Sequence, residues 1–288
     1  MATVEPQSSA SLDPPVALGA FVVGTLILSW TISFVSITDT VPVYTTLLLM
    51  LTPATVALVI RRVQGYSVLR TIRSSLRGST GRSLLFAVIY PVGFIGIAAL
   101  LALTTGLGTY QAGPENIVVT ALRQGGVVLL IVFLFESLLR MYGEEFGWRG
   151  YLLPELTVRW GRVKATAAVG VVWALFHSAF LYRAGVAIGV ENPLLITVVQ
   201  AAAVFTISFP FSYAYYLTDE SVFPVMILHL IWNIINPWIL GDIYANVEGL
   251  VAGQIFVVNG EGLVGVVLGL VALGGFVILF RRGTLITS

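Results

Sequence analysis

Long apolar stretches alternate with short polar segments along almost the whole chain. Each stretch has about the 20 residues that a helix needs to cross a bilayer at ~1.5 Å of rise per residue. The pattern predicts an all-α, polytopic membrane protein with about eight transmembrane helices and a buried polar site. The predicted spans cover residues 16–37, 42–60, 84–106, 117–143, 164–182, 193–217, 222–240 and 262–280.

Composition indicates that lipid is the main solvent of this protein. Hydrophobic residues make up 57% of the chain and charged residues 10%, whereas an ordinary soluble domain is about 25% charged. The mean hydropathy is +0.95. A net charge of +1 gives no indication of a nucleic-acid partner, and the absence of cysteine excludes thiolate metal sites and a cysteine nucleophile. We expect an N-terminal tail (1–15) and a single membrane domain (16–288).

The distribution of basic residues predicts an orientation. A cluster of arginines (residues 61–82) follows the second span, and basic loops are expected on the cytoplasmic side. With eight spans, all 15 basic residues except Arg123 and Arg183 then lie on that side. We therefore expect an integral protein of the cell membrane with both termini in the cytoplasm. Within the cluster, apolar residues recur at helical spacing over 68–76, which fits an amphipathic helix on the membrane surface or a plain basic loop.

Polar groups inside the spans are the candidates for chemistry, because charged residues there are costly. Near the end of the fourth span the chain reads GEEFGWRG. Glu144 and Glu145 are about 100° apart on a helix, so one at most points squarely into a given site. Glu145 and Arg149 are four residues apart and can pair on one face. We expect both glutamates near the cytoplasmic boundary, where a simple interfacial charge cluster is the alternative interpretation.

Both histidines of the chain lie in predicted spans. Trp173 and His177 share one helical face, and His229 and Asn233 share another. An imidazole and an amide at a common point could stabilise a developing oxyanion, whereas ordinary interhelical hydrogen bonding is the simpler alternative. We expect these groups and the glutamates to line one water-filled cavity that opens to the cytoplasm.

Taken together, these motifs resemble the CPBP family of intramembrane proteases, which includes type II CAAX prenyl endopeptidases and Abi-type proteins. The resemblance rests on Glu-Glu-x-x-x-Arg, aromatic-x-x-x-His and His-x-x-x-Asn in this order over residues 144–233. It places a catalytic core at about 117–240 and implies cleavage of a membrane-associated peptide or protein. The chain departs from the family pattern at Trp173, where phenylalanine is more common.

The resemblance also implies a role for each residue. Glu144 would act with His177 on the attacking water, and Glu145, Arg149 and Trp173 would support the site. His229 and Asn233 would stabilise the oxyanion. The family is often labelled metalloprotease, and zinc is the candidate metal, with Glu144, His177 and His229 as its ligands if it binds. Since the chain lacks His-Glu-x-x-His, we expect no tightly bound catalytic metal.

Five further residues receive structural interpretations. We expect Glu136 and Arg140 to form an ion pair with each other. The alternative interpretation is that they support the active site from beneath. Gln200 is interpreted as an interhelical hydrogen-bonding residue, and two tryptophans as interface anchors: Trp148 and Trp160.

Two other functions are compatible with a membrane bundle of this kind. One is a non-catalytic scaffold or immunity-type protein that keeps the protease fold. The other is a small transporter that uses the acidic and histidine groups as a proton relay. The complete set of polar motifs favours the protease, and the spans show no two similar halves of the kind found in transporters.

Overall fold

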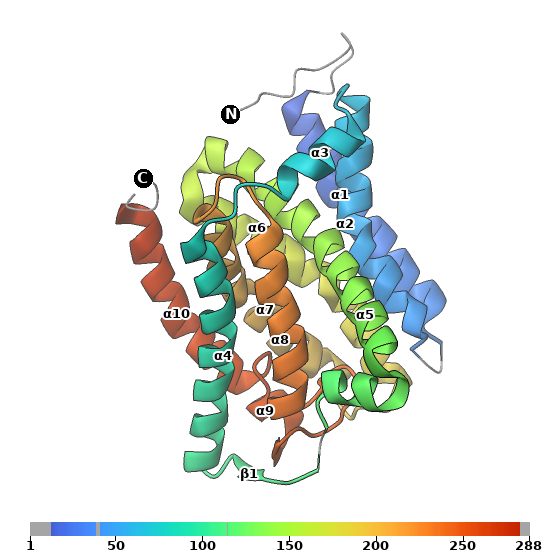
Figure 1. The fold of residues 1–288 in the computed structure, drawn as a ribbon, viewed down its shortest axis with the longest axis vertical. Helices are drawn as coiled ribbons and strands as arrows, with labels where there is room; N and C mark the ends of the chain where they lie inside the picture. The colour runs from blue at the N-terminus through green and yellow to red at the C-terminus, as the bar shows by residue number, and fades with distance from the viewer. Residues whose placement is uncertain (1–12, 39–40, 114, 283–288) are drawn as a thin grey trace.

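Long apolar helices make up most of the computed structural model, which describes residues 13–38, 41–113 and 115–282 (Figure 1). The fold class is the all-α one predicted from the sequence. The predicted tail, residues 1–15, lies mostly outside the described residues. The elements in chain order are α1 (Pro14–Ser36), α2 (Val43–Val63), α3 (Val68–Ser75), α4 (Gly81–Thr104), β1 (Gly108–Tyr110), α5 (Ile117–Glu145), η1 (Phe146–Leu152), α6 (Leu153–Ala187), α7 (Pro193–Tyr216), α8 (Phe223–Leu240), β2 (Val251–Gly253), α9 (Ile255–Val258) and α10 (Leu263–Arg282).

Seven helical stretches among the described residues are long and apolar enough to cross a membrane. One of them, Ile117–Ala187, contains 71 residues, which would extend roughly 107 Å as a straight helix. A hydrocarbon core is only about 30 Å thick. The stretch is broken at Gly126 (φ 61°) and Gly161 (φ 73°), in a backbone conformation that favours glycine. It therefore supplies two crossings, and the total agrees with the predicted eight.

The helix that carries the two glutamates continues well past its predicted end at residue 143. The backbone runs from α5 into η1, a π-helical segment in which the Leu153 amide donates to the Trp148 carbonyl, and then into α6 as far as Gly161. Glu144 therefore lies in the middle of a long helix, about 26 Å of axis from either break. Its predicted position at a helix end is wrong, because the π turn keeps the backbone helical where the hydropathy falls.

Two glycines allow this helix to contact α2 closely. A Cβ atom on Gly143 would lie 2.3 Å from the Met50 carbonyl oxygen, and one on Gly147 would lie 2.3 Å from Pro53 Cβ. Small residues at a spacing of four are a common solution for close helix packing in membranes. Since successive helical residues point about 100° apart, this contact turns the intervening glutamates away from α2. They face α6 and α8 instead.

The remaining packing builds a bundle around these helices. α6 packs against α7 and α1, α8 packs against α4 and α5, and α10 packs against α7. The strands β1 and β2 pair antiparallel, with Thr109 opposite Ala252, and they tie the loop after α4 to the segment before α10. The two-stranded sheet of β1 and β2 lies at the end of the bundle away from α3 (Figure 1).

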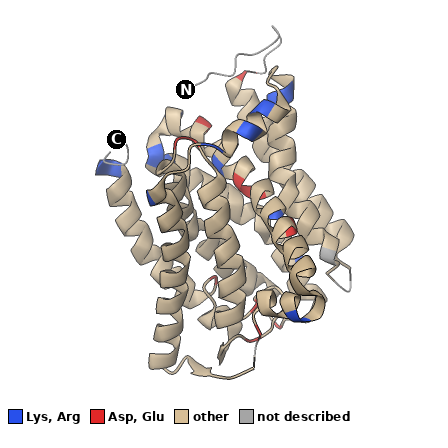
Figure 2. Cartoon of the chain, in the orientation of Figure 1, with Lys and Arg blue, Asp and Glu red and all other residues tan. Residues whose placement is uncertain are grey.

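Charge is concentrated at one end of the bundle. Most lysine and arginine positions gather where α1 begins and α10 ends, and few lie at the opposite end (Figure 2). The segment predicted as an amphipathic helix or a basic loop is helical over Val68–Ser75, with Leu69 76% exposed. This asymmetry agrees with the pattern on which the orientation was predicted, and the cytoplasmic location of this end stays a prediction.

Candidate active site

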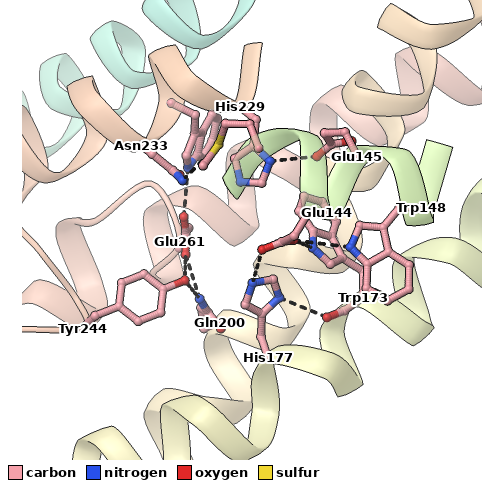
Figure 3. Close-up of polar contacts among 12 residues, drawn as sticks. Glu144, Glu145, Trp148, Trp173, His177, Gln200, His229, Asn233, Tyr244 and Glu261 are labelled. Atoms are coloured by element: carbon pink, nitrogen blue, oxygen red, sulfur yellow. Dashed lines mark hydrogen bonds and ion pairs between the residues drawn. The ribbon is translucent and has the colours of Figure 1, made fainter. Parts of the chain in front are cut away.

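Three helices bring the predicted polar residues to one cavity (Figure 3). The cavity has a volume of about 350 Å³, and α5, α6 and α8 each contribute polar groups to its lining. Glu145 and Arg149 are not among the lining residues. The predicted site residues that line it are Glu144, Trp173, His177, His229 and Asn233.

The Glu144 carboxylate is held by one oxygen and free at the other. Its Oε2 accepts hydrogen bonds from Trp173 Nε1 at 2.7 Å and from Trp148 Nε1 at 3.3 Å. Its Oε1 is buried and has no hydrogen-bond partner among the described residues. A buried oxygen of this kind normally has a partner, so a small molecule such as water is the expected occupant of the space in front of it.

His177 lies across that space from Glu144. The distance from His177 Nε2 to Glu144 Oε1 is 3.8 Å, which is too long for a hydrogen bond. His177 Nδ1 lies 3.1 Å from the Trp173 carbonyl oxygen. Because a carbonyl can only accept, this contact assigns the proton to Nδ1 and leaves Nε2 of the neutral ring as an acceptor. Two acceptors therefore face the gap.

The Glu145 carboxylate is bound by Arg149 and His229 and does not line the cavity. Its carboxylate accepts two hydrogen bonds from Arg149 Nη1, at 2.9 and 3.2 Å, and one from His229 Nδ1 at 2.7 Å. The Glu145 and Arg149 side chains are both 0% exposed. The Arg149 guanidinium also lies 4.2 Å from the centre of the Trp173 ring. The predicted pairing of Glu145 with Arg149 is confirmed, and it fixes the His229 ring.

His229 and Asn233 present polar groups to the cavity from successive turns of α8. Because His229 Nδ1 contacts a carboxylate, Nε2 can donate to a ligand only when the ring carries both protons. The Asn233 amide contacts the Met141 sulfur at 3.6 Å, which is a weak interaction that a better acceptor could replace. Both side chains are placed to contact a polar group in the cavity.

The role of Trp148 was not predicted from the sequence. The prediction of an interface anchor is wrong: Trp148 is fully buried, and its indole donates to Glu144. The signal was present in the spacing, since residues four apart share a helical face. Trp160, by contrast, is 53% exposed.

Glu261 is a second residue that was missed, at the far side of the same cavity. It lies just before α10 and accepts hydrogen bonds from Gln200 at 2.8 Å, Trp232 at 2.9 Å and Tyr244 at 3.2 Å. Gln200 therefore forms tertiary hydrogen bonds, but the predicted contact between helices is wrong, because its partners Glu261 and Tyr244 lie in turns between α8 and α10. Burial and the nearby Glu261 carboxylate raise the pKa of Tyr244 well above its ordinary value, which keeps that hydroxyl a donor.

The carboxylates and imidazoles do not form a three-ligand metal site in the described part of the chain. No three histidine, aspartate or glutamate side chains there are close enough to hold one ion. The set considered from the sequence, Glu144, His177 and His229, therefore does not gather around one point in the described residues.

Fold and site together define a class: a polytopic membrane protein with a glutamate and a histidine facing each other in a cavity between its helices. Residues 126–235 match the model of a protein family described as Rce1-like, type II CAAX prenyl endopeptidase. The segment that holds the site is therefore similar to the CAAX-type intramembrane proteases that the motifs resemble. No curated protein matches the chain.

Proposed function

We propose that this protein hydrolyses a peptide bond of a membrane-associated peptide or protein, with Glu144 as the base that activates water. The observation that carries the proposal is the gap between Glu144 Oε1 and His177 Nε2, which are 3.8 Å apart and both able to accept a proton. A water molecule in contact with both atoms directs its two protons to them. Its oxygen lone pairs then face the cavity, where a substrate carbonyl can approach.

The proposed reaction has two steps. Glu144 removes a proton from the water while the oxygen forms a bond to the carbonyl carbon, which gives a tetrahedral intermediate with a negative oxygen. Glu144 then transfers the proton to the amide nitrogen as the carbon–nitrogen bond breaks. The products are a carboxylic acid and an amine, and the carboxylate is regenerated.

The other site residues have supporting roles in this proposal. His229 and Asn233 donate to the negative oxygen of the intermediate, and each such donor contributes on the order of 2.7–4 kcal/mol to lowering the barrier. Trp173 and Trp148 hold the second oxygen of Glu144. Glu145 accepts a hydrogen bond from His229 Nδ1 and thereby orients the ring, so that Nε2 faces the cavity.

We propose that the reaction proceeds without a tightly bound metal. The support is that no three histidine, aspartate or glutamate side chains of the described residues gather around one point. A base, an orienting imidazole and oxyanion donors also suffice for water activation. Activity that persists after chelator treatment, with no zinc in the purified protein by elemental analysis, is the expected result. Loss of activity with chelator and its recovery with zinc would contradict this part of the proposal.

Cleavage of defined peptides tests the proposal. The purified protein in detergent is incubated with matched peptides, prenylated and unprenylated, and the products are identified by mass spectrometry. Glu144→Gln and His177→Ala should abolish cleavage while leaving the circular dichroism spectrum unchanged. Glu115→Gln, at an exposed glutamate in an ion pair with Arg123, is the matched control. Normal turnover by the Glu144 variant would refute the assigned chemistry.

A further inference from the structure

A second charged residue of α5 lines the cavity beside Glu144. Arg140 lies one helical turn before Glu144, about 6 Å along the axis, and it contributes to the cavity lining. The pairing with Glu136 that the sequence predicted is confirmed, because Arg140 Nη2 lies 2.6 Å from Glu136 Oε2. Glu136 is not among the lining residues, so its carboxylate lies to one side of the guanidinium.

The ion pair uses only part of the hydrogen-bonding capacity of Arg140. A guanidinium carries five N–H donors, and Glu136 is bound through Nη2 alone. The Nε atom is buried and has no hydrogen-bond partner among the described residues. Since a buried donor without an acceptor destabilises a protein, the unused donors indicate an acceptor that a ligand supplies.

The charges around the cavity determine what that ligand is. Arg140 is the only basic residue among the described residues that line it, whereas Glu144, Asp242 and Glu261 are acidic. A carboxylate entering the cavity is repelled by these acids and attracted by the Arg140 guanidinium. The planar guanidinium also matches the geometry of a carboxylate better than an ammonium group would.

We propose that Arg140 binds a carboxylate of the peptide substrate and thereby sets specificity; this inference rests on the proposed peptidase function. An extended peptide advances ~3.3–3.6 Å per residue, and Arg140 is one turn from Glu144. The recognised carboxylate therefore lies within about three residues of the cleaved bond. It is supplied either by the C-terminus of the substrate or by an aspartate or glutamate side chain.

The test compares otherwise identical peptides that differ in this carboxylate. A peptide that the wild-type protein cleaves is prepared as the free acid, as the C-terminal amide, and as amides with glutamate or glutamine near the cleaved bond. The wild-type protein should cleave the better carboxylate peptide about 10- to 100-fold more efficiently in kcat/KM than its neutral counterpart. Preference for the free acid identifies the C-terminus, and preference for glutamate over glutamine identifies a side chain.

Variants of the two partners should change this ratio in opposite directions. Arg140→Gln should bring it close to one. Glu136→Gln should raise it, because the guanidinium then loses its competing carboxylate. A merely structural ion pair would leave the ratio unchanged in both variants. Arg123→Gln, which removes the arginine of the exposed Glu115–Arg123 ion pair, controls for loss of an arginine from α5. If Arg140→Gln fails to fold, two other variants give the same test. One is the double variant Arg140→Gln with Glu136→Gln, which leaves no charge unpaired, and the other is Glu136→Gln alone.

Binding separates this inference from the proposed reaction. Fluorescence anisotropy of dansyl-labelled acid, amide, glutamate and glutamine peptides on the Glu144→Gln protein reports recognition without turnover. One outcome separates the two proposals: the wild-type protein cleaves no peptide, a carboxylate peptide binds more tightly than its neutral counterpart, and Arg140→Gln removes this difference in binding. The peptidase proposal then fails and the carboxylate site stands. A carboxylate preference that is absent, or that survives in Arg140→Gln, overturns the inference.

Discussion

The buried ion pair of Glu145 and Arg149 offers a quantitative test of how the site is held together. Arg149→Met removes a guanidinium that is 0% exposed, makes two hydrogen bonds to Glu145 and packs on the Trp173 ring. Removal of one partner of a buried pair typically costs about 3–5 kcal/mol, because the other charge remains buried. We expect a loss of this size in the free energy of unfolding.

A double variant isolates the electrostatic cause. Glu145→Gln combined with Arg149→Met removes both charges of the pair, and the glutamine oxygen can still accept from His229. Neutral replacements of buried pairs are often close to neutral in stability, so most of the loss should be recovered. Arg159→Met is the matched control: the Glu155–Arg159 pair has the same spacing but about 30% exposed side chains. Its loss should be at most about 0.5 kcal/mol.

The measurement is equilibrium unfolding in mixed micelles, followed by far-ultraviolet circular dichroism as the fraction of denaturing detergent increases. The wild type and Arg159→Met should be most stable, the double variant slightly less stable, and Arg149→Met least stable. An Arg149→Met protein within about 1 kcal/mol of the wild type would refute the argument, since buried charges are expected to cost more. A double variant no more stable than the single one would also refute it.

Three further results are expected. Gly147→Ala should lower the unfolding free energy by about 1–3 kcal/mol, because its Cβ would lie 2.3 Å from Pro53 Cβ; calorimetry checks this. Burial raises the pKa of Asp242, so the folded state binds this proton more tightly and stability falls as pH rises through the raised pKa. Asp242→Asn should remove that decline in melting curves recorded from about pH 4 to pH 7. In the cysteine-free chain, Arg77→Cys should react with impermeant maleimide from the cytoplasmic side and Tyr110→Cys from the opposite side.

Local properties of the sequence predicted most of the fold. Hydropathy over about 20 residues is enough to locate a spanning helix, and the helical repeat is enough to place two residues on one face. The predicted pairing of residues 136 and 140 and of residues 145 and 149 is confirmed by ion pairs. The helix boundary after residue 143 could not be predicted in this way, because a π turn and tertiary packing continue the helix through a less apolar segment.

The sequence by itself determined which residues were available for chemistry and which of them share a helix face. Only the tertiary structure decided how each helix is rotated against its neighbours. Close contact of Gly143 and Gly147 with α2 sets the rotation of α5, so that Glu144 lines the cavity and Glu145 pairs with Arg149. The same packing buries Trp148 against Glu144 and brings Glu261 to the cavity from a distant segment. These contacts depend on side chains of different helices, and no local pattern contains that information.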